Sequence, residues 1–319
     1  MRKGVCSRTR EGYIHPAVMR KSTLVAVLSF AFAALGPRVS EAGLVTCGQA
    51  SQGDTVLGES CTGDILMHGG RLDLAGHTVH GTIACDADIC EIVSSTRGGA
   101  VVGFGVPLSV GVVAGGGAVE GAGDLRVDGV TVGGFSTGVS GRNIVLTNAR
   151  IAGNIWRGAE ALENIEAVDT VVRRNGDDGL HARLGGVAID GSDIAANGGS
   201  GVRALAGAVV VGSTITGNVR DGVENYSEPA LVIDSRVRTN GRHGVRSDDS
   251  DCDPRDVLEL RGSEVTGNGT NAACATEGCA DLVACGAPVL DERSSCDKSL
   301  QMAPEAPGEG WAVCEGDAR

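Results

Sequence analysis

The stretch VDTVVRRNGDDGLHARLGGVAIDGSDIAANGGSGV, residues 168–202, decides the fold because its pattern recurs along the chain. An apolar residue stands three positions before each repeated asparagine, and in the first five units a glycine follows four positions after it. The asparagines are spaced by 21 or 22 residues, apart from a last gap of 28: Asn154, Asn175, Asn197, Asn218, Asn240 and Asn268. A fixed period of this length indicates a repeat protein.

Each unit contains three short apolar runs separated by Gly, Asn, Ser or Asp, and no run is long enough for an ordinary helix. Three strands per unit predict a coil, and coils stacked about 4.8 Å apart pair their backbone groups with the coils above and below. Asparagine is expected to form the tight turn, since it tolerates left-handed backbone angles and its amide both donates and accepts. The sequence therefore predicts an all-β, right-handed parallel β-helix with about 21–22 residues per coil. A leucine-rich repeat is disfavoured because its leucine comb is absent.

Composition and charge narrow the class further. With 51 glycines and 3% aromatic residues among 319, the core must be built from small and medium aliphatic side chains. The formal net charge is −13, and residues 1–42 hold seven basic and two acidic residues, so the remainder carries about −18. Such a field repels nucleic acid, which is therefore not expected as a partner. Residues 171–246 are the exception, with nine arginines against eight acids, so a site for an anionic ligand is expected there.

The first 42 residues have the pattern of a cleavable signal peptide. A basic segment, residues 19–21, precedes an apolar core, residues 24–35, which is too short to span a membrane. Small residues at Ser40 and Ala42 predict cleavage before Gly43. A secreted, periplasmic or cell-envelope protein without a membrane span is expected. The alternative is a lipoprotein, because residues 44–47 (LVTC) loosely resemble a lipobox.

Ten cysteines follow residue 42, and all of them avoid residues 91–251. An even number in an exported chain predicts disulfides at the two ends, with connectivity left open, and the absence of a CxxC pair argues against structural zinc. The expected organisation is a signal peptide and three further segments: residues 1–42 (1–18 being upstream of the true start), a cysteine-containing lead at 43–71, the β-helix at 72–270 and a disulfide-rich cap at 271–319.

Two stretches resemble a known family. The segment LDLAGHTVHG, residues 72–81, looks like the DLNGHTI-x-G coil of the bacterial right-handed β-helix repeat proteins. The repeats at 142–268 resemble the same pectate lyase-like superfamily, which includes pectate lyases, mannuronan C5-epimerases and periplasmic copper-site maturation proteins. The resemblance implies the fold and leaves the activity open, because this fold hosts lyases, hydrolases, epimerases and adhesins.

Stacking makes neighbours of residues one period apart, and six positions after the asparagine the column consists of charged residues. We expect these side chains to project outward about 4.8 Å apart and to bind ligand: Glu160, His181, Arg203, Glu224 and Arg246. A histidine beside arginine and carboxylates suits proton abstraction next to a uronate carboxylate. The alternative is a solvated ladder of alternating charges that stabilises the stack.

Two coils also resemble mannuronan epimerases. The segment DDGLH, residues 177–181, stands where those enzymes carry an aromatic-Gly-x-Asp-Pro-His motif, and NGRHG, residues 240–244, resembles their NG-x-HG coil. The resemblance implies His181 as a base and Arg242 and His243 in carboxylate binding or proton transfer, with Asp178 as a further catalytic candidate. The motif's aspartate–proline pair is missing around His181, and no catalytic tyrosine is aligned.

Two acidic groups are weaker candidates. The residues Asp169, Asp190 and Asp234 form a second predicted column, which suits either glycoside hydrolysis or the stabilisation of turns. The insertion at residues 248–256 holds six carboxylates, so Asp249, Asp251 and Asp253 are candidate calcium ligands in what is otherwise a plain acidic loop. No cofactor is required by the sequence.

Three functions follow. The sequence favours a non-catalytic exported protein that binds glycan or protein at the cell envelope or outside the cell. The alternatives are a polysaccharide-active enzyme, such as a uronan epimerase, a lyase or a glycosidase, and a structural surface rod. Clustering of His181, Arg203, Arg242 and His243 in one cleft would favour the enzyme, and a featureless face would favour the rod. The oligomeric state stays open.

Overall fold

The computed structural model describes residues 42–104, 110–114, 123–247, 258–272, 274, 278–285, 288–301 and 313–317. All of them belong to one compact unit, Ser40–Arg319. The predicted signal peptide and the candidate calcium ligands Asp249, Asp251 and Asp253 lie outside the described residues.

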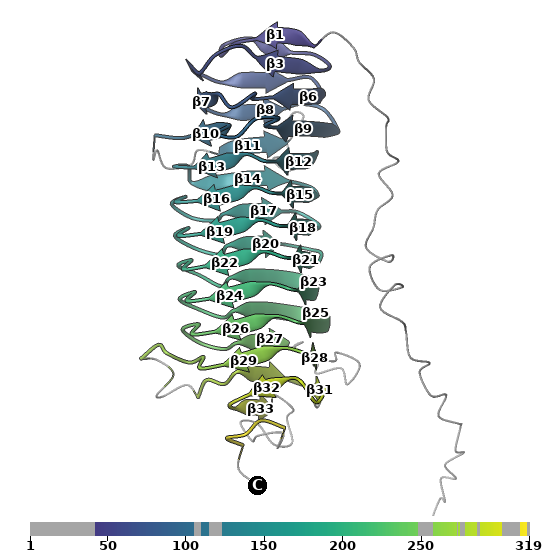
Figure 1. Cartoon of the computed structure of the whole chain (residues 1–319), viewed down its shortest axis with the longest axis vertical. Coiled ribbons are helices and arrows are strands. Elements are labelled where there is room, and N and C mark those ends of the chain that lie inside the picture. Colours follow the sequence, from purple (N-terminus) through teal and green to yellow (C-terminus); the bar gives the residue numbers. More distant parts are fainter. Residues whose placement is uncertain are drawn as a thin grey trace, which may run out of the picture. The chain divides into compact units, whose positions relative to one another are not determined.

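The chain winds as a stack of coils whose strands form three parallel columns, here called A1, A2 and B (Figure 1). Column A1 contains β2 (Ala50–Ser51), β5 (Ile65–Met67), β8 (Ile83–Cys85), β11 (Val110–Ala114), β14 (Thr137–Gly141), β17 (Ala159–Ala161), β20 (Leu180–Ala182), β27 (Val245–Ser247), β30 (Leu282–Ala284) and β33 (Ser299–Gln301). Column A2 contains β1 (Gly43–Val45), β3 (Thr55–Leu57), β6 (Gly70–Asp73), β9 (Ile89–Val93), β12 (Asp124–Asp128), β15 (Ile144–Thr147), β18 (Ile165–Val168), β21 (Val187–Asp190), β28 (Leu258–Arg261) and β31 (Val289–Leu290). Column B contains β4 (Cys61–Thr62), β7 (Thr78–His80), β10 (Ala100–Val102), β13 (Thr131–Gly133), β16 (Arg150–Ala152), β19 (Val171–Arg173), β22 (Asp193–Ala195), β24 (Thr214–Thr216), β26 (Arg236–Arg238), β29 (Glu264–Thr266) and β32 (Ser295–Cys296).

Two strands are longer than the rest and run without a turn from column A1 into column A2. They are β23 (Val202–Val211) and β25 (Val223–Ile233), which pair with each other through a register shift between Ala206 and Ala208. In the preceding coil, by contrast, a turn separates β20 from β21. The surface therefore has a step, meaning the change from a turn after β20 to the uninterrupted strand β23 in the next coil. The pairings between described strands are parallel, which confirms the predicted parallel β-helix.

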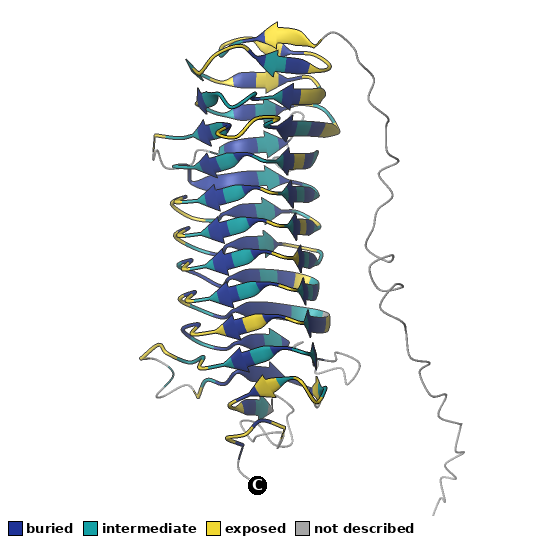
Figure 2. Cartoon of the chain, in the orientation of Figure 1, coloured by how far each residue is buried: buried dark blue, intermediate teal, exposed yellow. Residues whose placement is uncertain are grey.

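The core follows from the alternation of side chains along each strand. In column B the middle residue of each strand points inward and is fully buried, giving a continuous aliphatic stack: Val132, Ile151, Val172, Ile194, Ile215, Val237 and Val265. Figure 2 shows buried segments recurring in every coil, with exposed residues concentrated at turns and at the two ends of the stack. Such stacking removes apolar surface from water at about 25 cal/mol per Å², and no large aromatic core is needed.

The predicted asparagine ladder is present and buried. Each Nδ2 donates to the Oδ1 of the next asparagine at 2.9–3.0 Å, from Asn154 through to Asn268. The expectation that asparagine itself adopts left-handed angles is wrong. Positive φ occurs at the residue just before each asparagine: Gly153, Arg174, Ala196, Gly217, Thr239 and Gly267. That residue makes the turn, and the asparagine then places its amide inside the stack, where it bonds along the axis.

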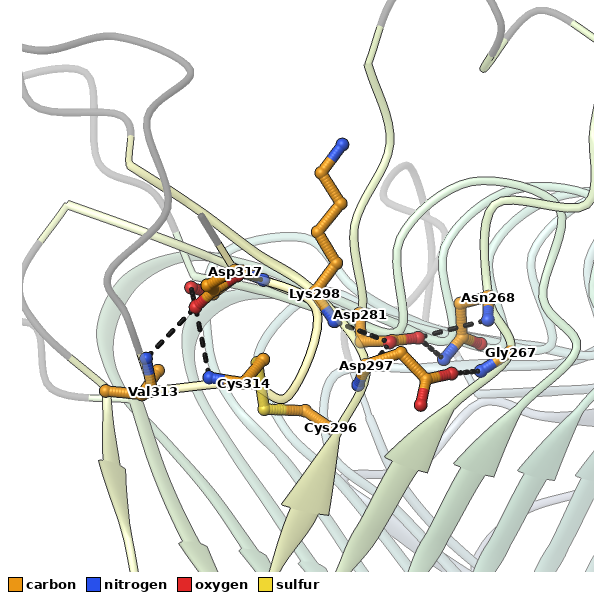
Figure 3. The surroundings of a disulfide bond; sticks show 10 residues. Gly267, Asn268, Asp281, Cys296, Asp297, Lys298, Val313, Cys314 and Asp317 are labelled. Atoms are coloured by element: carbon orange, nitrogen blue, oxygen red, sulfur yellow. Dashed lines mark hydrogen bonds between the residues drawn. A yellow bond between two sulfur atoms is a disulfide. The ribbon is translucent and has the colours of Figure 1, made fainter. Parts of the chain in front are cut away.

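The C-terminal segment ends the ladder with a carboxylate. Asp281 accepts hydrogen bonds from Asn268 Nδ2 at 2.7 Å and from the backbone nitrogens of Asp297 and Lys298 at 2.9 and 3.2 Å (Figure 3). A disulfide joins Cys296 to Cys314 beside it. The last asparagine therefore has a partner where the repeat stops.

Disulfides are confirmed at both ends of the stack: Cys47–Cys61, Cys85–Cys90, Cys274–Cys279 and Cys296–Cys314. Cys285 is disulfide-bonded as well. Paired strands begin at β1 and continue to β33, so coils are also present in residues 43–71 and in 271–319, which the sequence set apart as lead and cap. Within the described residues, no helix has the length and apolarity needed to cross a membrane.

Candidate functional site

The charged column predicted on A1 is in register. Glu160 pairs with His181, His181 with Arg203, Arg203 with Glu224, and Glu224 with Arg246 in successive coils. The alternative of a solvated ladder of charges is wrong at one position. Glu224 is 0% exposed, whereas the others are half-buried. It is covered because the coil on either side carries an arginine and its own strand carries a tyrosine.

Glu224 is the centre of a buried ion cluster. Its Oε1 accepts a hydrogen bond from Tyr226 at 2.5 Å, and its Oε2 accepts one from Ser200 Oγ at 2.9 Å. Three guanidinium groups lie 3.7–4.0 Å from its carboxylate oxygens: Arg203, Arg220 and Arg246. Burial pushes the pKa of Glu224 upward, but the tyrosine hydrogen bond, the arginine charges and the serine outweigh it and hold the pKa below the ordinary value. Glu224 is therefore ionised at neutral pH.

A second acid is buried beside the column, in the turn that leads into it. Asp178 is 0% exposed, and its Oδ1 accepts the backbone N–H of Ser200 at 2.8 Å. Its Oδ2 has no hydrogen-bond partner among the described residues and lies 3.6 Å from His181 Nδ1 and 3.8 Å from Arg203. Asp221 repeats the arrangement two coils on and accepts the backbone N–H of His243 at 2.9 Å. These carboxylates hold the turns that present the column.

Burial and charge displace both members of the Asp178–His181 pair. Burial raises the pKa of Asp178 to about 6. Burial, followed by the charges of Arg157, Arg203 and Arg183, lowers the pKa of His181 to about 4. At pH 7 the histidine is therefore neutral, and its buried Nδ1 makes no hydrogen bond within the described part of the chain. A neutral imidazole beside an arginine can accept a proton from a bound molecule.

An open pocket of about 290 Å³ lies over these groups. Its lining comes from three consecutive coils: His181, Ala182, Arg183, Arg203, Ala204, Leu205 and Tyr226. The pocket exists because of the step described above, where the turn after β20 gives way to continuous strands. The Arg203 guanidinium lies 5.3 Å from the centre of the Tyr226 ring, and its NH2 donates to the Tyr226 hydroxyl at 2.9 Å. A cation, a phenol and a neutral imidazole thus converge on one hollow.

Not every predicted site residue reaches this hollow. Arg242 and His243 are absent from its described lining. His243 is buried, and its Nδ1 accepts the backbone N–H of Ala280 at 3.1 Å, so it faces the C-terminal segment. Glu160 is held instead by Arg157 and Arg183.

The predicted column of Asp169, Asp190 and Asp234 is wrong. Asp190 pairs with Val168 and Val211, one position away from the row of the other two. Asp169 and Asp234 adopt left-handed angles at turns, which is a structural use of aspartate.

Sequence reasoning missed Tyr226. The repeats were aligned by their asparagines and glycines, and in the coils before β23 the position that matches Tyr226 falls near a turn. A signal was present, because residues 223–233 contain no Gly or Asn-Gly break before the next apolar run. That pattern indicates one long strand, which carries the tyrosine over the column.

No metal centre is formed within the described ranges, where no three His, Cys, Asp or Glu side chains are grouped suitably for an ion. The candidate calcium ligands lie outside those ranges, so calcium binding stays a prediction.

Parallel coils, a continuous aliphatic stack and an asparagine ladder define a parallel β-helix repeat protein. A family model described as "Right handed beta helix region" matches residues 128–285, in agreement with this fold. No curated protein and no solved structure matches it.

The displaced pKa values predict a pH signature. Folded Asp178 keeps its proton up to about pH 6, whereas unfolded Asp loses it near 3.8, so its stabilising contribution declines as pH rises through this window. Folded His181 stays neutral down to about pH 4, whereas unfolded His takes up a proton near 6.5, so its contribution declines as pH falls. In the unsubstituted protein the two slopes oppose each other and largely cancel.

A substitution that removes one of the two groups reveals the pH dependence of stability that the other group contributes. From pH 4 to 6, the free energy of unfolding of Asp178→Asn, relative to the unsubstituted protein, should rise by about 2 kcal/mol, and that of His181→Gln should fall by about the same amount. Urea unfolding at pH 4, 5 and 6 measures both. Profiles parallel to that of the unsubstituted protein would contradict the assignment.

Proposed function

We propose that this is an exported protein that binds an acidic, uronate-containing polysaccharide in the pocket on column A1. The observation that carries the proposal is the placement of Arg203. Its side chain is 29% exposed, lines the pocket and is oriented by Tyr226, so a guanidinium is presented to a carboxylate at a site lined by a neutral His181. Arginine is suited to this task because its planar fork matches a carboxylate in two hydrogen bonds.

The rest of the pocket suits a sugar ring. Tyr226 and Leu205 supply apolar surface, and Leu205 is 39% exposed. Sugar sites commonly combine such a surface with a few polar groups that fix orientation. Export is supported by the four disulfides, which form and persist in oxidising compartments. Displaced pKa values gathered around a hollow favour a ligand site over a purely structural rod.

A second candidate function is favoured by one observation: a neutral His181 lines the pocket beside Arg203. A uronan lyase or epimerase begins by removing the proton from the carbon next to the carboxylate. His181 would accept that proton, and Arg203 would stabilise the negative charge that develops on the carboxylate.

Binding is tested by calorimetric titration with oligomers of galacturonate, mannuronate and guluronate, and with neutral oligosaccharides of equal length. We expect binding of an acidic oligomer, weakened at least ten-fold in Arg203→Met, a loss of about 1.4 kcal/mol or more. Arg238→Met is the matched control, because Arg238 lies on column B away from the pocket. Equal affinity in both variants, or a preference for neutral oligomers, would contradict the proposal.

The same samples distinguish binding from catalysis. Incubation in deuterated water followed by NMR detects hydrogen exchange at the carbon next to the carboxylate, and an unsaturated product reveals elimination. Either signal, lost in His181→Gln with binding retained, establishes the enzyme. Binding without exchange or product establishes the non-catalytic protein.

A further inference from the structure

Three arginines lie close together on column B, apart from the pocket on A1. Arg150 opens β16, Arg173 closes β19 in the next coil, and Arg174 follows directly. The pairing of Ala152 with Arg173 sets Arg150 and Arg173 diagonally across two adjacent strands. Both are half-buried and Arg174 is exposed. The pKa of Arg150 is lowered by burial and then by the charges of Arg173 and Arg174, which shows how near the three groups lie.

These arginines differ from most others in having no counterion. Within the described residues, none of the three makes an ion pair, and no side-chain hydrogen bond is formed by them. The buried Nε of Arg173 is without a hydrogen-bond partner. On the two neighbouring strands Arg173 pairs with Ala152 and Ala195, and these small side chains leave the space beside Arg173 open. The nearest acid in register is Asp193, which pairs with Val171, and it lies beyond ion-pair distance.

Three fixed positive charges without a counterion repel one another, so the arrangement costs free energy in the isolated protein. The cost is removed when an anion binds between them. We propose that Arg150, Arg173 and Arg174 form an anion site for a tetrahedral oxyanion, a sulfate or phosphate group carried by a glycan. A tetrahedral group offers oxygens in several directions and can accept from three guanidinium groups, whereas a planar carboxylate is satisfied by one fork.

This site is independent of the proposed uronate site. The two lie on different columns. In the pocket Arg203 pairs with Glu224 and Arg183 with Glu160, whereas no acid among the described residues pairs with this trio. A glycan with both carboxylate and sulfate groups would engage both, but each site can be removed alone.

The test is calorimetric titration in chloride buffer with dextran sulfate, uncharged dextran, a phosphorylated dextran, inorganic sulfate and inorganic phosphate. We expect the protein to bind the sulfated or the phosphorylated polymer. The polymer that binds more tightly shows whether the site prefers a sulfate or a phosphate group. Affinity should fall at least ten-fold in Arg150→Met and Arg173→Met, and should fall steeply with added salt. Arg238→Met is the control, because Arg238 also makes no ion pair with any residue that the structure describes and stands on the same column.

Stability supplies a second readout. Without ligand, Arg150→Met should leave the thermal midpoint unchanged or raise it, because a repulsion is removed, while Arg236→Met, which breaks the pair with Glu264, should not raise it. Equal loss of polymer binding in Arg238→Met and Arg150→Met would overturn the site, since it would show nonspecific attraction. No binding of either polymer would overturn it as well. Arg203→Met should leave this binding intact, so failure here is distinguishable from failure of the uronate proposal.

Discussion

Replacing Asn197 with alanine should lower the free energy of unfolding by about 3–5 kcal/mol, a large part of the stability of a typical domain. Asn197 is 0% exposed, and its Oδ1 accepts both the backbone N–H and the Nδ2 of Asn175 at 3.1 and 3.0 Å. Its own Nδ2 donates to Asn218 Oδ1 at 2.9 Å and to Val172 O at 3.3 Å. Alanine leaves the buried backbone N–H of Asn175 without an acceptor and leaves Asn175 Nδ2 with only the long bond to Ile151 O at 3.4 Å, and each such loss costs about 1–3 kcal/mol.

The matched control is Asn164→Ala. Asn164 also bonds to neighbouring coils, to Asn143 Oδ1 and Gly186 N, but it is partly exposed, so water can replace its amide at lower cost. Urea unfolding measures both variants, and hydrogen exchange at the Asn175 amide reports whether the damage is local, as expected where coils interact with their neighbours alone. If Asn197→Ala costs no more than Asn164→Ala, the ladder does not stabilise the stack.

A second diagnostic variant is Asn197→Asp. It retains the acceptor oxygen toward Asn175 but places an oxygen against Asn218 Oδ1, where the amide donated. The variant should be severely unstable at neutral pH and recover as the pH falls, because a protonated carboxyl can donate again.

Replacing Glu224 with glutamine should lower the free energy of unfolding by about 3–5 kcal/mol, although the shape of the side chain is preserved. The carboxylate is fully buried, and Arg203, Arg220 and Arg246 surround it at 3.7–4.0 Å. Glutamine keeps one oxygen, for either the Tyr226 or the Ser200 hydroxyl, places an amide nitrogen against the other and removes the charge. Three arginines are then left to repel one another around a neutral group, and removing one partner of a buried charge cluster is strongly destabilising.

Arg203 provides the partner variant. Arg203→Met should be less damaging than Glu224→Gln, because two arginines still neutralise Glu224. In the double variant the losses should fall short of their sum by 1 kcal/mol or more, about the coupling expected of contacting charges. Thermal and urea unfolding of the two single variants and the double variant complete the cycle. Additive losses would show that the pair does not interact, and the oriented guanidinium on which the uronate proposal rests would lose its support.

Much of this molecule follows from residue spacing. The period of 21–22 residues, the asparagine ladder and the register of Glu160, His181, Arg203, Glu224 and Arg246 could all be predicted, because stacking converts a fixed spacing into contact. One error shows the limit of such counting. Asp190 was placed with Asp169 and Asp234, but a shift of one residue along a strand reverses the direction of its side chain.

The pocket, in contrast, was decided by tertiary structure. Tyr226 reaches Arg203 because β25 runs straight through a position where other coils turn, and no repeat pattern records that. Burial raises the pKa of Asp178. Burial together with nearby arginines lowers the pKa of His181, and one of them, Arg203, stands on the next coil. The repeat by itself determined which residues stack. Which of them are covered, charged or open to a ligand depended on the local path of the chain, since burial and electrostatics are set by neighbours in space.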